Sequence, residues 1–85
     1  MQKFILLCRS ITHAQRLRDT LERIGLRCRI ERPPIGLSDK GCSYAVSVKT
    51  DYITAVMQHL QEVRLLPERV FYLSEDGDYR EILPK

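Results

Sequence analysis

The sequence predicts a small α+β fold, in which an antiparallel sheet is covered on one face by two helices. Apolar residues recur in short runs or at every second position in several segments of strand length, and at helical spacing in two others. The first six of these segments follow the order strand, helix, strand, strand, helix, strand. That order is typical of the ferredoxin-like βαββαβ arrangement, whose antiparallel sheet has the strand order 4-1-3-2.

The first strand and the first helix are predicted from residues 3–24. Residues 3–8 (Lys-Phe-Ile-Leu-Leu-Cys) form the apolar run of a central strand. The helix is expected to start at Thr12, because Thr12 and Gln15 have the spacing of a capping box. Gly25 is the expected left-handed residue at its end. Its apolar positions are 14, 17, 21 and 24.

Two alternating segments predict the second and third strands. Residues 26–32 place Cys28 on the apolar side and arginines on the other, so Cys28 is expected in the core. Pro33 and Pro34 end that strand, because proline cannot donate a hydrogen bond to a sheet. Residues 43–49 alternate again, and residues 33–42 between the two strands form a loop.

The last third of the chain predicts a helix and two strands. Thr50 or Asp51 is expected to cap a helix with apolar residues at 53, 56, 57, 60 and 63. Residues 69–73 (Arg-Val-Phe-Tyr-Leu) form the fourth strand. The pair Asp76-Gly77 indicates a hairpin that adds an edge strand over about residues 79–83.

Length and composition set the class of protein. A chain of 85 residues has room for one core, so we expect a single domain over residues 1–85. With 44% hydrophobic and 29% charged residues it is globular in composition, and no segment approaches the roughly 20 apolar residues that span a bilayer. We therefore expect a cytoplasmic protein that does not enter a membrane. Residues 1–49 carry ten Lys/Arg against four Asp/Glu, and residues 50–85 carry four against seven.

The predicted topology brings possible thiol chemistry to one edge of the sheet. The chain has three cysteines, at positions 8, 28 and 42, and no Cys-x-x-Cys spacing, which argues against a disulfide framework or a structural zinc site. Cys42 ends the loop, and Cys8 ends a neighbouring strand, so the two should lie close together. Thr12 and His13, at the start of the first helix, belong to the same edge. A helix N-terminus stabilises a thiolate, so a reactive cysteine fits there.

With these residues in view, the chain resembles the putative selenium/sulfur carrier family. The matching features are the apolar strand leading into Thr12-His13-Ala14, the two prolines after the second strand, and Ser38-Asp39 shortly before a cysteine and an alternating strand. The resemblance covers about residues 3–73. Cys42 is at the position of the family's Cys-Gly pair. The resemblance therefore implies that the sulfur atom of Cys42 holds the carried sulfur or selenium. Here Ser43 follows the cysteine, and its hydroxyl could bond the sulfur.

The resemblance therefore implies a persulfide-type carrier that uses the loop thiol of Cys42. Thr12, His13, Cys8 and Ser43 would shape the surroundings of that thiol. Partners would be sulfur or selenium donor and acceptor proteins. We expect no cofactor, and no stand-alone enzyme activity, because the carboxylates are scattered without the paired spacing of acid/base catalysis.

Three other interpretations are considered beside the carrier, and the first of them stays open. One is a non-catalytic regulatory or homodimeric interaction module using the sheet face away from the helices, where Arg27, Arg29, Ser47 and Lys49 are expected. Apolar Ile5 and Leu7 on the same face suggest either sheet-to-sheet dimerisation or cover by the carboxy-terminal tail. An RNA-binding role is not expected, because this face lacks stacking aromatics on its central strands. A metal site formed by Cys8, His13 and Cys42 is not expected either, since no pair has a recognised ligand spacing.

Overall fold

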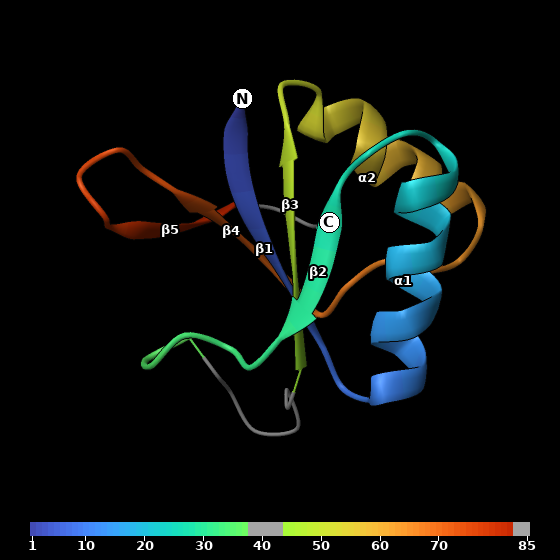
Figure 1. The fold of residues 1–85 in the computed structure, drawn as a ribbon, viewed down its shortest axis with the longest axis horizontal. Coiled ribbons are helices and arrows are strands. Elements are labelled where there is room, and N and C mark those ends of the chain that lie inside the picture. Colours follow the sequence, from blue (N-terminus) through green and yellow to red (C-terminus); the bar gives the residue numbers. More distant parts are fainter. Residues whose placement is uncertain (38–43, 83–85) are drawn as a thin grey trace.

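A computed structural model describes residues 1–37 and 44–82 of the chain as an α+β fold, which confirms the predicted class. Five antiparallel strands form one sheet in the order β2-β3-β1-β4-β5, and two helices lie beside it (Figure 1). The elements are β1 (Gln2–Cys8), α1 (Ile11–Arg23), β2 (Cys28–Glu31), β3 (Tyr44–Thr50), α2 (Ile53–Glu62), β4 (Arg69–Leu73) and β5 (Tyr79–Ile82).

The full strand order differs in detail from the predicted 4-1-3-2. Read from β4, the first four strands run 4-1-3-2, and β5 pairs with the outer side of β4 and becomes the edge. The turn between β4 and β5 is closed by the Ser74 N–H, which donates to the Asp78 carbonyl at 2.8 Å. Gly77 has φ 90°, a conformation that glycine adopts without strain. The predicted hairpin is therefore present, and Leu83, at its predicted end, lies outside the described residues.

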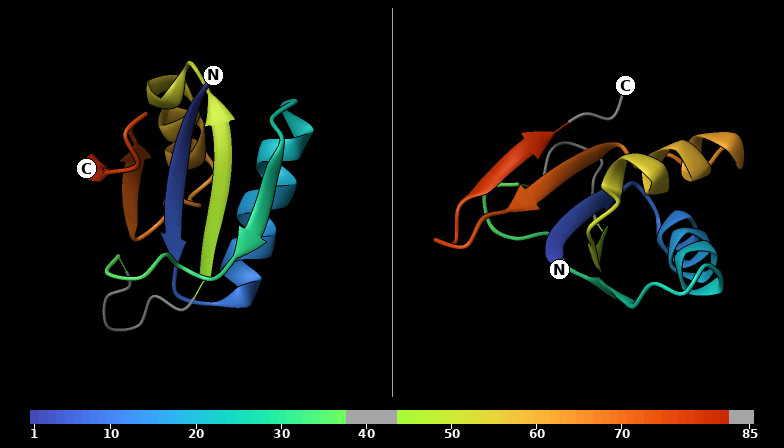
Figure 2. Two further views of the ribbon diagram at one scale, coloured as in Figure 1. Left: turned by 60° about the vertical axis from the view of Figure 1, so that its left-hand side comes forward. Right: turned by 90° about the horizontal axis from the view of Figure 1, so that it is seen from above.

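Both helices cover the same face of the sheet, as predicted (Figure 2). Side chains alternate along a strand, so every second residue of β1, β3 and β4 points toward the helices. These residues pack with the apolar faces of α1 and α2 into one buried cluster. Its members are Phe4, Leu6, Cys8, Ala14, Leu17, Leu21, Val46, Val48, Val56, Leu60 and Val70.

The predicted start of α1 at Thr12 is wrong. The cap is Ser10, whose hydroxyl accepts the His13 backbone N–H at 3.1 Å, so Ile11 and Thr12 already belong to the helix. Serine and threonine are both favoured caps, and Ser10 lies at the position where the chain leaves β1. The end of α1 agrees with the prediction, because Gly25 has φ 91° and its N–H donates to Glu22.

The predicted cap of α2 is also wrong. Tyr52 occupies the cap position and makes no side-chain hydrogen bond there. The Thr50 hydroxyl, two residues before the cap, instead accepts the Tyr52 N–H at 3.0 Å. Val63, predicted on the apolar side of this helix, lies past its end and is exposed.

The sheet face away from the helices has a small core of its own. Ile5, Leu7, Ala45 and Phe71 are buried there, and Leu37 packs against them. The segment that follows β2 crosses β3 and β1 on this face (Figure 2). Ile5 and Leu7 are therefore covered within the chain, with side chains that are only 1% and 0% exposed.

Within the described ranges, neither helix has the length and apolar character that crossing a membrane requires.

Candidate functional site

The edge predicted for thiol chemistry is formed by the end of β1, the start of α1 and the start of β3. Cys8, the last residue of β1, lies directly opposite Tyr44, the first residue of β3. The helix α1 begins three residues after Cys8, at the same end of the sheet (Figure 1). Cys42 and Ser43 lie outside the described residues, so their predicted proximity to Cys8 stays a prediction.

The start of α1 leaves two backbone donors at this edge. Of the first four N–H groups of the helix, His13 donates to the Ser10 hydroxyl and Ala14 donates to the Ser10 carbonyl at 3.0 Å. The N–H groups of Ile11 and Thr12 have no acceptor among the described residues. Together with the helix dipole, these groups make the edge favourable for an anion such as a thiolate.

Thr12 and His13 both lie in the first turn of α1. The Thr12 side chain is exposed, whereas His13 is half-buried. The structure thus brings these two predicted site residues to the same end of the sheet as Cys8. It gives neither side chain a hydrogen bond within the described residues.

Cys8 is enclosed by the main core. Its side chain is 0% exposed and belongs to the cluster between the sheet and the helices. Its Sγ lies 3.8 Å from the Leu6 carbonyl, at the long end of hydrogen bonds to sulfur. A thiol in this position is out of reach of a solvent-borne reagent or a partner protein.

Cys28 is half-buried on β2 and faces α1. Its thiol donates to the Arg18 carbonyl at 3.6 Å. Burial raises the pKa of the Cys28 thiol to about 11, and the negative charge of Glu22 acts in the same direction. The Cys28 thiol is therefore protonated at neutral pH, and a protonated thiol is a poor nucleophile.

Residues 3–72 match the family described as putative Se/S carrier protein-like. The chain belongs to this family. No curated protein and no solved structure matches the sequence. The family name indicates carriage of selenium or sulfur, and the match spans all three cysteines of this Se/S carrier-like chain.

A metal centre finds no support in the described part of this Se/S carrier-like protein. Within residues 1–37 and 44–82, no three His, Cys, Asp or Glu side chains are grouped so that they could hold a metal ion. The alternative site of Cys8, His13 and Cys42 includes a residue outside these ranges, so that alternative is not tested.

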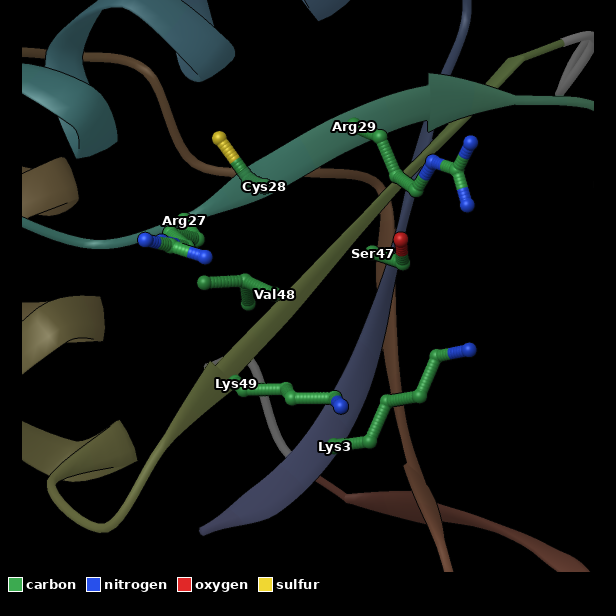
Figure 3. A pocket seen from close by; sticks show the side chains of 7 residues that line it. All are labelled: Lys3, Arg27, Cys28, Arg29, Ser47, Val48 and Lys49. Carbon is green, nitrogen blue, oxygen red and sulfur yellow. The ribbon is translucent and has the colours of Figure 1, made fainter.

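A second feature of the protein lies on the sheet face away from the helices. A hollow of about 330 Å³ is lined by Cys28 and Val48 and by five polar residues, which are the four cations Lys3, Arg27, Arg29 and Lys49 together with Ser47 (Figure 3). Four of these five residues were predicted for this face. Lys3 was missed, although it is in phase with Ile5 and Leu7 along β1.

Proposed function

We propose that this protein carries sulfur or selenium on the thiol of Cys42. The observation that carries the proposal is the state of the other two cysteines. Cys8 is fully buried, and the pKa of Cys28 is about 11, so neither offers an accessible thiolate at neutral pH. A member of the Se/S carrier-like family would need an atom that bonds the carried sulfur or selenium, and a cysteine sulfur can do so. Cys42 is the remaining cysteine of the chain.

The position of Cys42 in the sequence supports this choice. It comes two residues before Tyr44, which pairs with Cys8 at the edge where α1 begins. The N–H groups of Ile11 and Thr12, which have no acceptor among the described residues, and the dipole of α1 would favour the anionic form of a thiol at this edge. Thr12 and His13 in the first turn would tune that environment.

Cys8 and Ser43 have supporting roles in this proposal. The buried Cys8 side chain would form part of the apolar floor of the site. The Ser43 hydroxyl would donate to the sulfur that Cys42 carries.

The transfer step needs no external oxidant. The Cys42 thiolate attacks the outer sulfur of a donor protein's persulfide, the S–S bond of the donor breaks, and the donor cysteine leaves as a thiolate. Cys42 then bears the persulfide, and the reverse exchange passes the sulfur to the thiolate of an acceptor protein. A selenium adduct follows the same exchange. The reducing cytoplasm would keep Cys42 a free thiol between transfers.

The alternative of a homodimeric interaction module lacks its main support. It relied on an exposed apolar surface at Ile5 and Leu7, and both side chains are buried within the chain. Light scattering of the purified protein tests the remaining possibility. A dimer whose mass is unchanged in a Cys42→Ser variant would favour the module over the carrier.

Intact-mass spectrometry of protein purified from cells tests the carrier. We expect adducts of about 32 Da for sulfur or about 80 Da for selenium, removable by a thiol reductant. The adduct should be absent from a Cys42→Ser variant and retained in a Cys28→Ser variant, which is the matched control. An adduct that persists in Cys42→Ser, or iodoacetamide labelling that is equally slow at all three cysteines of the folded protein, would rule the proposal out.

A further inference from the structure

The hollow on the open sheet face combines positive charge from three segments of the chain. Lys3 comes from β1, Lys49 from β3, and Arg29 from β2, with Arg27 just before that strand. Figure 3 shows Ser47 between Arg29 and Lys3, with Lys49 beside Lys3. Among the described residues that line the hollow, none is a carboxylate.

The strand register creates this concentration of charge. Lys3 lies directly opposite Lys49, and Arg29 lies directly opposite Ser47. Directly opposed side chains have Cβ atoms about 4.5–5.5 Å apart, so like charges at such a pair destabilise the sheet. The fold thus holds Lys3 and Lys49 in an arrangement that its own stability disfavours.

Within the described residues, no ion pair neutralises these charges. The ion pairs of the described residues lie elsewhere, between Arg9 and Glu68, Arg18 and Asp19, and Arg69 and Glu81. Lys3, Arg27, Arg29 and Lys49 form no ion pair within the described ranges. A local conflict of this kind is typical of a binding site, because a ligand supplies the missing counter-charge.

We propose that the hollow binds a small ligand with two or more phosphate groups, recognised through its phosphates. A terminal phosphate group carries about −1.5 to −2 charge at pH 7, so the two ends of a short phosphate chain come close to balancing four cations. The guanidinium groups of Arg27 and Arg29 offer paired donors that match phosphate oxygens, and the lysines add point charges. The Ser47 hydroxyl has no hydrogen-bond partner within the described residues and adds a further donor.

The size of the hollow favours a small molecule. Its volume of about 330 Å³ is at the lower end of the range for ligand pockets. In the described part of the chain no aromatic side chain lines it, so these residues offer no platform on which a nucleobase could stack. Inorganic polyphosphate and the phosphate chain of a nucleoside polyphosphate share the chemistry that this site recognises.

This site is independent of the proposed thiol carrier. The Lys3–Lys49 pair lies five residue positions along β1 from the Cys8–Tyr44 pair. At about 3.4 Å per residue this separates the lysine pair from the thiol edge by about 17 Å. Phosphate binding can therefore succeed or fail whether or not Cys42 carries sulfur.

Calorimetric titration with sodium tripolyphosphate at low ionic strength tests the proposal. We expect the wild-type protein to bind, and a Lys3→Gln, Lys49→Gln double variant to bind about tenfold or more weakly. The matched control is Arg16→Gln with Arg80→Gln, which removes the same net charge from two exposed arginines outside the hollow. The control should retain wild-type affinity within about twofold, because distant charges are screened.

Three further measurements make the result decisive. Thermal unfolding should show that the Lys3, Lys49 variant is at least as stable as wild type, since a like-charge pair has been removed. Equal affinities for tripolyphosphate and a nucleoside triphosphate would support phosphate-chain recognition alone, and tighter nucleotide binding would support a nucleoside polyphosphate. The proposal is overturned if tripolyphosphate does not bind, if the control weakens binding equally, or if a single-stranded oligonucleotide binds more tightly than both small ligands.

Discussion

The structure predicts a strong pH dependence for alkylation of Cys28. Only the thiolate reacts with iodoacetamide, and burial raises the pKa of this thiol from 9.0 to about 11. That rise lowers the thiolate fraction about a hundredfold at any pH well below 9. The rate at Cys28 in the folded protein should therefore still be increasing between pH 9 and pH 10.

The assay follows the modification of each cysteine by peptide mass mapping. A Cys42→Ser background leaves Cys8 and Cys28 as the thiols of the chain. Samples are quenched at intervals between pH 7 and pH 10, and the same protein unfolded in urea is the reference for an ordinary thiol. We expect folded Cys28 to react about a hundredfold more slowly than unfolded Cys28 at pH 8.

A Glu22→Gln variant tests the second cause of this shift. The negative charge of Glu22 raises the pKa of Cys28, so its removal should lower that pKa and speed alkylation. Glu62→Gln on α2 is the control and should leave the rate unchanged. The reasoning is refuted if the rate at folded Cys28 levels off near pH 9, or if it lies within about threefold of the unfolded rate.

The same pKa has a consequence for stability. The pKa of Cys28 is higher in the folded state than the ordinary value, so the folded state binds this proton more tightly. Its contribution to the free energy of unfolding is fully present below pH 9 and is lost as the pH rises from 9 to about 11.

Three further predictions concern the folded state. Ser10→Ala should lower the free energy of unfolding in urea by about 1 kcal/mol through loss of the α1 cap, whereas Thr12→Ala should change it by less than about 0.5 kcal/mol. Leu17→Ala, which truncates a side chain with 0% exposure, should cost about 2–5 kcal/mol in the same assay, and a smaller loss would mean that the core closes over the gap. Glu81→Gln should lower the melting temperature slightly at pH 7, since Arg69 donates to both carboxylate oxygens at 2.8 and 2.7 Å and lowers the Glu81 pKa. That contribution is present above pH 4.5 and is lost as the pH falls below it, so the two melting temperatures should converge in acid; a constant difference would contradict the assignment.

Local patterns were enough to predict the element types and most of their bounds. The strand predicted over residues 69–73 is β4 as observed, because a short β-branched and aromatic run after Pro67 has few alternatives. Gly25 and Gly77 marked a helix end and a turn correctly, since each adopts a positive φ that other residues avoid.

Competition between equivalent local signals explains the errors at the helix starts. Ser10 and Thr12 are both good caps, and the sequence pattern alone does not say which one follows the last residue of β1. Before α2, Thr50 is the last residue of β3, and its hydroxyl accepts the Tyr52 N–H before the helix begins. Which residue caps a helix therefore depends on where the preceding strand ends.

Long-range packing decides what covers the second sheet face. Periodicity placed Ile5 and Leu7 on that face correctly, but it could not show that Leu37 packs over them. The contact joins residues about 30 positions apart, and no local pattern encodes it.

For the candidate site, the predicted topology placed Cys8, Thr12 and His13 at one edge of the sheet. The burial of Cys8 and the raised pKa of Cys28 depend on packing and could be found only in the structure.

The positive charge at β2 has a further consequence for association between copies of the protein. As an outer strand, β2 leaves one row of backbone N–H and C=O groups without a neighbouring strand. Another copy adding its own β2 there would bring two sets of arginines, at 27 and 29, into close approach. Their repulsion keeps this edge from extending the sheet between molecules, so the same side chains that make the hollow attractive to anions also protect the protein against aggregation.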